Sequence, residues 1–222
     1  MVAGKLCAAI VSKDSNTMIR SARQALDEGA DLVEFRLDHL LRIEKDLPDR
    51  LRGFSGRCVI TIRSKEQGGA FAGSEGSRIE MLKAFSKIKP LYLDIELHAA
   101  RKNPEAVAEL KKNCRNLIVS FHDFDATPRI NALVQVYNEA IEMAGIVKVV
   151  TMARSAQDNI TSMLLYRKAR PRGSLIAFTM GDIGTLTRVL CLYAGSPMSY
   201  VSFGNKPSAP GQIPLKTMRR LI

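Results

Sequence analysis

The sequence predicts an α/β protein with the (β/α)8 fold, the TIM barrel. Three observations lead to this prediction: eight strand-length apolar segments recur along the chain, stretches of helical periodicity separate most of them, and the length suits one large core. The chain has 222 residues, of which 46% are hydrophobic. No stretch rich in Pro, Gly and Ser, and no charged block, is long enough to act as a linker. We therefore expect residues 1–222 to form a single barrel domain.

The predicted strands are short segments in which apolar and β-branched residues dominate. In chain order they cover residues 6–11, 31–38, 58–63, 91–97, 116–123, 146–153, 174–180 and 200–205. Helices are expected where apolar residues recur at helical spacing, often after Pro or before Gly, namely over residues 17–29, 77–88, 104–113, 128–145, 155–169 and 183–194. The segment 40–53 fits neither pattern. Strands that alternate with helices pair in parallel through right-handed crossovers, and eight such units close a barrel.

An open, doubly wound sheet is the alternative architecture for alternating strands and helices. Its dinucleotide-binding form carries a Gly-x-Gly-x-x-Gly turn after the first strand, and no such turn follows residues 6–11. Eight strands also match the number that a closed barrel requires. The barrel is therefore favoured.

The chain is strongly basic, with a formal net charge of +11. Clustered Lys and Arg would indicate nucleic-acid binding, because they neutralise phosphates. Here the basic residues are dispersed, aromatic residues make up only 6% of the chain, and no helix-turn-helix, RNP or zinc-finger pattern is present. We expect no nucleic-acid partner and interpret the charge as a basic surface around an anionic small molecule.

Apolar runs and cysteines bear on where the protein acts. The longest apolar runs are strand-length and too short to span a membrane, and the N-terminus lacks the apolar core of a signal peptide. The cysteines have no metal-binding or redox spacing, so we expect reduced, structural thiols at Cys7, Cys58, Cys114 and Cys191. These features predict a cytoplasmic protein with no membrane partner and no metal site.

Polar residues alternate with apolar ones in the predicted strands. In residues 31–38 the apolar side chains would pack against helices, which leaves Glu34, Arg36 and Asp38 facing into the barrel. The same alternation places Arg63 at the end of the third strand. Catalytic groups of TIM barrels project from these strand ends. A purely structural ion-pair network is the alternative interpretation, and the alternation alone does not decide between them.

His122 lies near the end of the fifth predicted strand, and Lys148 lies in the middle of the sixth, so neighbouring strands bring them together. Four aliphatic residues flank Lys148. Burial among them disfavours the charged ammonium, and a neutral amine can attack a ketone to form an imine. The alternative is a lysine whose amine reaches the rim of the barrel. The other two histidines, His39 and His98, are interpreted as structural.

Near the C-terminus, residues 179–188 contain a Gly-rich turn that leads into a helix carrying Arg188. The loop 206–212 follows the eighth predicted strand. In many TIM barrels this region binds phosphate through a helix N-terminus, and an arginine suits a carboxylate equally well. The pattern therefore predicts an anionic ligand and leaves phosphate and carboxylate both open.

Taken together, these residues resemble the type I 3-dehydroquinate dehydratase family over nearly the whole chain. A single short motif would carry little weight, but an ordered set with matching spacing is specific. The similar segments are Glu34-Phe35-Arg36 with Asp38-His39, the Thr-Ile-Arg-Ser segment with its Gly-Gly loop, Phe121-His122-Asp123-Phe124, Val147-Lys148-Val149, Met180-Gly181 with Gly184 and Arg188, and Ser208-Ala209-Pro210-Gly211-Gln212.

The resemblance implies a hydro-lyase of the shikimate pathway that converts 3-dehydroquinate to 3-dehydroshikimate by syn elimination of water. It implies no metal and no organic cofactor. Lys148 would form an imine with the substrate ketone, and His122 would be the general acid and base. The loop around Pro210 would close over the site. The substrate would be held by Glu34, Arg36, Arg63, Arg188, Ser208 and Gln212.

Two positions match the family less closely. The family usually has a glutamate just before the Gly-Gly of the third loop, whereas this chain has Gln67 there, with Glu66 one residue earlier. Ser12, at the end of the first predicted strand, is a further candidate for substrate contact.

Two other functions remain as alternatives: an imine-forming barrel aldolase acting on a sugar phosphate, and a basic nucleic-acid-binding protein. The first predicts protection by phosphate, and the second predicts binding that falls steeply with salt. Neither accounts for His122, Lys148 and the loop at Ser208 together. A homodimer is left open as a further partner.

Overall fold

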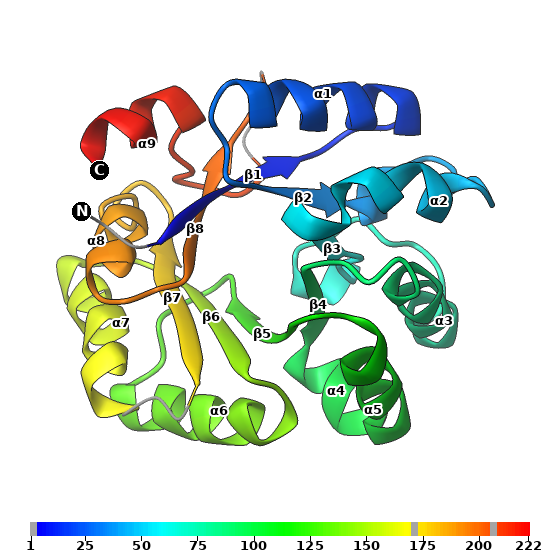
Figure 1. Ribbon diagram of the computed structural model, residues 1–222. Coiled ribbons are helices and arrows are strands. Elements are labelled where there is room, and N and C mark those ends of the chain that lie inside the picture. Colours follow the sequence, from blue (N-terminus) through cyan, green and yellow to red (C-terminus); the bar gives the residue numbers. More distant parts are fainter. Residues whose placement is uncertain (1–3, 170–172, 205–207) are drawn as a thin grey trace.

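The computed structural model describes residues 4–169, 173–204 and 208–222. Its eight strands pair in parallel in the order β7-β6-β5-β4-β3-β2-β1-β8, and Figure 1 shows them arranged as a barrel. The predicted (β/α)8 fold is therefore confirmed. The strands are β1 (Lys5–Ile10), β2 (Leu32–Arg36), β3 (Cys58–Thr61), β4 (Tyr92–Glu96), β5 (Leu117–Asp123), β6 (Ile146–Met152), β7 (Ser174–Met180) and β8 (Met198–Ser202).

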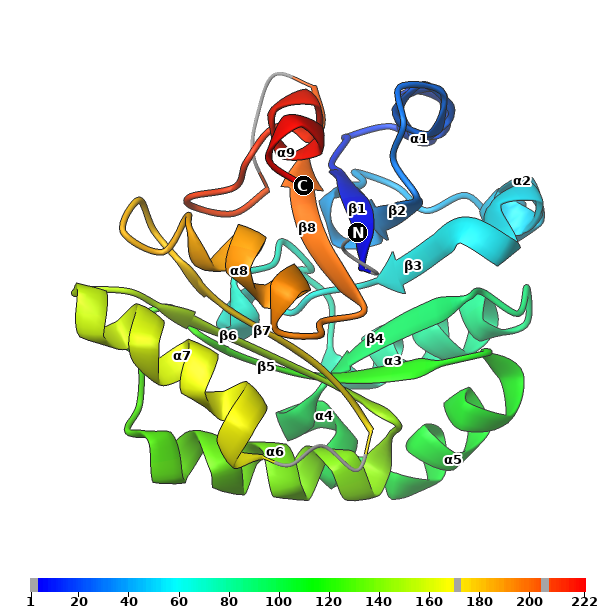
Figure 2. The same ribbon diagram turned by 60° about the vertical axis from the view of Figure 1, so that its left-hand side comes forward.

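Helices cover the outside of the strands, as Figures 1 and 2 show. All six predicted helices are found, and the segment 40–53 contains one short helix followed by 3-10 turns. The six-residue α4 and the seven-residue α9 were not predicted. The helices are α1 (Ser15–Asp27), α2 (Leu47–Leu51), α3 (Glu75–Ser86), α4 (Leu97–Lys102), α5 (Pro104–Asn113), α6 (Ile130–Met143), α7 (Ala156–Lys168), α8 (Thr187–Tyr193) and α9 (Leu215–Leu221).

The seam between β7 and β8 is the one place where the described strands of the barrel are not joined by a backbone ladder. Side chains bridge it instead: the rings of Phe178 and Tyr200 lie 6.3 Å apart, centre to centre. The barrel is thus nearly closed, and an aromatic contact lies across its seam.

Three strands, β2, β3 and β8, differ from their predicted bounds by two or more residues at one or both ends, and β3 ends at Thr61 instead of residue 63. β2 stops at Arg36, and Leu37–His39 form a 3-10 turn in which Asp38 stays buried. β8 begins at Met198, two residues before its predicted start, and ends before Gly204, whose φ of +81° breaks the extended chain. The predicted end of this strand, residue 205, lies outside the described residues.

The two faces of β2 show how the sequence separates core from site. Phe35 is fully buried and packs edge-on against Phe54, with ring centres 5.2 Å apart. Glu34 and Arg36, on the opposite face, point into the barrel as the alternation predicted.

The structure also bears on the expectations for the cysteines and for membrane-spanning segments. The four cysteines are buried and free, and none of the described helices has the length and apolar composition needed to cross a bilayer.

Candidate active site

A cavity lies where the strands of the barrel end. It is small, about 60 Å³, compared with the several hundred Å³ typical of ligand pockets. It brings together all but one of the predicted site residues, although they come from six strands or the segments that follow them. Its lining comprises Glu34, Arg36, Arg63, Gln67, Gly68, His122, Phe124, Lys148, Val150, Phe178, Met180, Arg188, Tyr200, Ser208, Ala209 and Gln212.

Ser12 is the exception. Its hydroxyl donates a hydrogen bond to the backbone oxygen of Asp14 at 2.9 Å and accepts one from the Asp14 N–H at 3.2 Å. Ser12 therefore shapes the turn into α1 and does not line the cavity.

A larger cavity, about 590 Å³, lies beside the first and shares Gln67 with it. Its rim carries charges of both signs, including Glu66, Arg101 and Lys102, and neither Lys148 nor His122 reaches it. The smaller cavity therefore contains the reactive groups.

Lys148 lies in the middle of β6 and is 5% exposed. Its Nζ is 3.3 Å from Oδ2 of Asp94 and 4.0 Å from the centre of the Tyr200 ring. Both groups stabilise positive charge on the nitrogen. Val147 and Val149 point to the opposite face of the strand. The amine is therefore buried, as predicted, but a carboxylate accompanies it, which the aliphatic neighbours in the sequence did not indicate.

Arg63 follows β3 and is surrounded by acceptors. Its guanidinium lies 2.9 Å from Asp94 and 3.6 Å from Glu96, and it donates a hydrogen bond of 2.7 Å to Ser120 Oγ. Ser120 in turn donates to Oδ1 of Asp94 at 2.7 Å. Burial disfavours the charge on Arg63, but the two carboxylates outweigh it and raise its pKa. Burial likewise acts to raise the pKa of Asp94, yet Arg63 and Lys148 hold that pKa well below its ordinary value.

Glu34 and Arg36 also have protein partners. Glu34 accepts a hydrogen bond of 2.8 Å from the Thr61 hydroxyl. Arg36 forms a two-pronged ion pair with Asp38, at 3.0 and 2.8 Å. The structural ion-pair alternative is thus realised for Arg36 and Arg63, and contact of either residue with a ligand stays a prediction.

His122 lies one residue from the end of β5, opposite Val150 in the β5–β6 register. Its Nδ1 is buried and has no hydrogen-bond partner among the described residues. Burial, together with the positive charges of Arg63 and Lys148, holds the pKa of His122 well below its ordinary value of 6.5. The imidazole is therefore neutral at pH 7, with a ring nitrogen available to a ligand.

The loop after β3 packs onto the ring beside His122. Gly68 has a φ of +72°, and a Cβ at this position would lie 2.1 Å from the ring of Phe124. Phe124 in turn stacks on His122, with ring centres 6.1 Å apart. Gln67 lines the cavity and Glu66 does not. The amide, not the neighbouring acid, therefore lies on the His122 side of this loop.

Arg188 lies on α8 and is 1% exposed. It donates a hydrogen bond of 3.0 Å to the backbone oxygen of Pro210, and its guanidinium carbon is 4.6 Å from the centre of the Phe178 ring. Its Nε has no partner, and no described carboxylate forms an ion pair with it. Burial lowers the pKa of Arg188 to about 10, so it stays charged at pH 7. A buried charge without a counter-ion is costly, and an anionic ligand would offset that cost.

The segment from Ser208 to Gln212 covers the cavity beside Arg188. Gln212 Oε1 accepts hydrogen bonds from the Ser208 N–H at 2.8 Å and from its hydroxyl at 3.1 Å. The Gly181 N–H donates to Pro210 at 3.4 Å. Gly211 has a φ of +71°, and a Cβ there would lie 2.2 Å from the Gly181 oxygen. The segment therefore packs directly on the turn that leads to α8. Residues 206 and 207 of the predicted loop lie outside the described residues.

Sequence reasoning missed Asp94, Ser120 and Tyr200. A signal existed for Asp94, because it alternates with apolar residues in the fourth predicted strand just as Glu34 does in the second. Ser120 and Tyr200 carried no comparable signal, since a serine or a tyrosine within a strand is common. No group of three or more His, Cys, Asp or Glu residues in the described parts of the chain is arranged to hold a metal ion.

Comparisons of sequence point to one family. The family described as "Type I 3-dehydroquinase" matches residues 6–222. A 3-dehydroquinate dehydratase of Methanococcus maripaludis is 37% identical over 220 residues, which cover 98% of each chain. Another, from Methanocaldococcus jannaschii, is 32% identical over 219 residues and covers 97% of this chain and 96% of its own.

Comparisons of structure agree. A 3-dehydroquinate dehydratase from Geobacillus kaustophilus superimposes with a TM-score of 0.90 at 28% identity, covering 98% of this chain and 89% of its own. The enzyme of that name from Aquifex aeolicus gives a TM-score of 0.82 at 29% identity, covering 98% and 96%. A mutant tryptophan synthase alpha-subunit from Pyrococcus furiosus reaches a TM-score of 0.60 at 13% identity, covering 90% and 87%, which shows a shared fold alone.

The environment of His122 yields a prediction for pH. In the protein as it stands, we expect the imidazole to titrate below pH 6.5, because burial and the cations around it disfavour the charged ring. Gln67→Glu should raise this midpoint by up to about one unit, because a carboxylate nearby stabilises the imidazolium. The measurement is a pH titration of the histidine ring signals by NMR, with His122 assigned from a His122→Gln spectrum.

Two control variants make this titration specific. Gln67→Ala should leave the midpoint unchanged, and so should Glu66→Gln. If the midpoint moves with Glu66→Gln and stays constant with Gln67→Glu, then Glu66 and not position 67 lies beside His122, which contradicts the prediction.

Proposed function

The chain belongs to the type I 3-dehydroquinase family, and from that premise we propose that it removes water from 3-dehydroquinate through an imine on Lys148. It is an enzyme of the hydro-lyase class. One observation carries the proposal: a buried lysine amine inside the barrel shares a cavity with a neutral histidine and with a buried arginine that lacks a carboxylate partner.

The first step joins Nζ of Lys148 to the ketone carbon of the substrate. The amine adds to the carbonyl, and the carbonyl oxygen takes one proton from the nitrogen and one from solvent and leaves as water, so the nitrogen remains as a positively charged iminium. The former ketone carbon is C3 of the substrate ring. The positive charge on its nitrogen withdraws electrons from C2, the ring carbon next to C3. The C2–H bond is therefore acidified, which prepares it for removal of the proton.

His122 performs the proton transfers of the elimination. Its low pKa keeps the imidazole neutral and able to accept the C2 proton. The electron pair of the C–H bond moves into the iminium and gives a neutral enamine. The enamine electron pair then forms the C1–C2 double bond and expels the C1 hydroxyl, which the imidazolium protonates on the same face of the ring, and the nitrogen becomes an iminium again. Hydrolysis of the remaining imine releases 3-dehydroshikimate and regenerates the amine.

Arg188 is proposed to bind the substrate carboxylate. It is the cation of the cavity that lacks an acidic partner in the described parts of the chain, whereas Arg36 and Arg63 already face Asp38 and Asp94. The cavity of about 60 Å³ is too small for a substituted six-membered ring. The segment at Ser208 must therefore move away from Arg188 to admit substrate and can return to exclude water.

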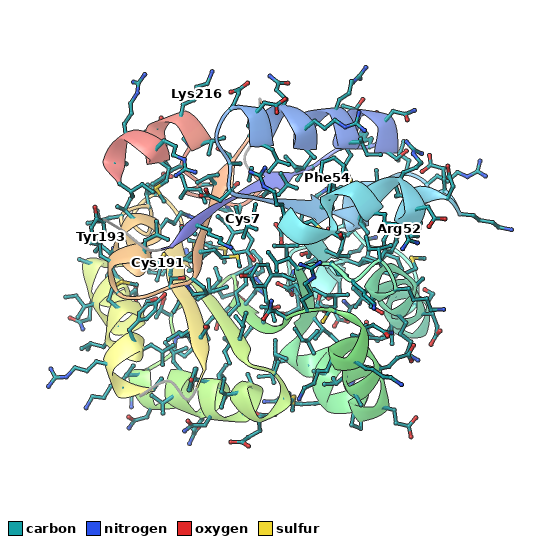
Figure 3. The ribbon with its side chains drawn as sticks, viewed as in Figure 1. Cys7, Arg52, Phe54, Cys191, Tyr193 and Lys216 are labelled. Carbon is teal, nitrogen blue, oxygen red and sulfur yellow. The ribbon has the colours of Figure 1, made fainter. Side chains whose placement is uncertain are left out.

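A second copy of this chain is the proposed protein partner, and the face formed by α7 and α8 supports it. This face exposes six apolar side chains, and Figure 3 shows one of them, Tyr193, at the outer edge of the molecule. The only charged residue between positions 183 and 204 is Arg188, which is buried. The six are Ile160, Leu164, Ile183, Leu186, Leu190 and Tyr193.

The charge of the chain supports a second copy as the occupant of that face. A chain with a net charge of +11 repels its own copies, so a two-fold contact is favoured where exposed charges are few, as over α8, whereas Arg167 and Lys168 are exposed at the end of α7. A two-fold contact through this face buries apolar surface on both copies and keeps the basic surfaces apart.

Location in the cytoplasm and lack of nucleic-acid binding stay predictions.

The proposed reaction is tested by mixing the protein with 3-dehydroquinate and following the ultraviolet absorbance of the conjugated enone product. We expect absorbance to rise, and we expect Lys148→Ala to abolish the rise. Borohydride added during turnover should fix a ligand-derived mass on the peptide that contains Lys148. Absence of a rise with the unaltered protein excludes the activity, and a label on Lys65 instead moves the nucleophile to a loop.

Arg188→Ala tests how the substrate is anchored. Loss of a charge-assisted contact in a desolvated site costs about 2 to 4 kcal/mol, so KM should rise by about 30-fold to 1,000-fold. Inorganic phosphate should compete only weakly with the substrate. Tight inhibition by phosphate, with little effect of the substitution on KM, would favour the sugar-phosphate aldolase instead.

The proposed dimer is tested by sedimentation velocity at about 50 µM protein. We expect twice the chain mass of 24.5 kDa, and the chain mass alone for Leu186→Glu combined with Leu190→Glu. Leu41→Glu is the control, because Leu41 is 82% exposed and lies elsewhere on the surface. A monomer in the unaltered protein, or equal masses for all three, contradicts the proposal.

A further inference from the structure

We propose that Asp94 is a further catalytic residue, whose carboxylate is the counter-ion of the positive charge on Lys148 Nζ in the iminium. Asp94 lies on β4, two strands away from Lys148 on β6. This inference rests on the proposed imine reaction. It adds to that reaction a carboxylate that is not among the residues proposed to hold the substrate.

The geometry fixes the carboxylate against the reacting nitrogen. Oδ2 of Asp94 is 3.3 Å from Nζ of Lys148. Oδ1 accepts a hydrogen bond of 2.7 Å from Ser120, which lies directly beside Lys148 in the β5–β6 register. Asp94 is 1% exposed. A buried carboxylate held at both oxygens cannot turn away when the charge on Nζ changes, so its field at the nitrogen is preorganised.

Counting charges shows that Asp94 is available to Lys148. Arg63 faces Asp94 at 2.9 Å and Glu96 at 3.6 Å. Glu96 is also 2.5 Å from Arg78, which pairs with Glu75 at 2.7 Å. Three cations and three carboxylates therefore form one chain of contacts. Lys148 stands at one end of it, and among the described residues Asp94 is the one acidic side chain that forms an ion pair with it.

Nζ stays positively charged from formation of the iminium until the proton transfer. The iminium forms when the carbonyl oxygen leaves as water, and it carries one positive charge at the nitrogen. Removal of the C2 proton by His122 then sends an electron pair into the iminium. The nitrogen becomes neutral, and the positive charge appears on the imidazolium. A carboxylate at Nζ keeps the imine protonated until this step, and only the protonated imine withdraws electrons strongly.

Asp94→Asn removes the charge while keeping the shape of the side chain. We expect kcat to fall by about 100-fold or more, the size of effect seen when a preorganised electrostatic group is lost. The alkaline limb of the kcat–pH profile should move to lower pH by about one unit or more, because an iminium without its counter-ion loses its proton more easily. Borohydride trapping on Lys148 should slow at the same pH, since borohydride reduces the iminium.

Glu96→Gln is the matched control. It removes another buried carboxylate of β4 that faces Arg63, but one that makes no contact with Nζ. We expect it to lower stability and to leave the alkaline limb in place. An alkaline limb that is unchanged in Asp94→Asn, or moved equally by Glu96→Gln, overturns the proposal.

Ser120→Ala covers the case in which Asp94→Asn does not fold because Arg63 loses its partner. This variant keeps every charge and removes one hydrogen bond to the carboxylate, worth about 1 kcal/mol. We expect kcat to fall by about 5-fold at constant KM, and an unchanged kcat contradicts the assignment. Lack of any turnover or label in the unaltered protein would instead refute the proposed function.

Discussion

Burying charge inside a barrel is the constraint on which the site depends. A charged side chain removed from water is costly unless a partner of opposite charge replaces the solvent. Here the partners come from different strands: Arg63 follows β3, Asp94 and Glu96 lie on β4, and Lys148 lies on β6. Each side chain is therefore held by a neighbour distant in the chain, and β3, β4, β5 and β6 have to come together before these charges are compensated.

The groups left without such compensation define where a ligand belongs. His122 is desolvated and surrounded by cations, so it stays neutral with an unpaired nitrogen. Arg188 is buried, charged and without an acidic partner in the described parts of the chain. Protein interiors rarely leave polar atoms in this state. A substrate with both a proton to lose and a carboxylate to be bound satisfies the two residues together.

Most of the fold was accessible from the sequence because its strands are short, apolar and regularly spaced. Where prediction failed, the signal was too brief. α4 has six residues and continues directly from Glu96, so a window long enough to show helical periodicity also includes strand. α9 has only seven residues. The end of β8 depends on the positive φ of Gly204, a property of the folded backbone that composition does not reveal.

The site was accessible only in part, for a different reason. Alternation along a strand tells which face a side chain occupies, and it placed Glu34, Arg36 and Arg63 correctly. It does not tell which residues of other strands share that face. The sequence neighbours of Lys148 are aliphatic and predict apolar surroundings for its amine. Asp94, more than fifty positions earlier, nevertheless places a carboxylate oxygen 3.3 Å from Nζ. Motifs reveal the groups that meet substrate, whereas the groups that set their charge emerge only when the register of β4, β5 and β6 is known.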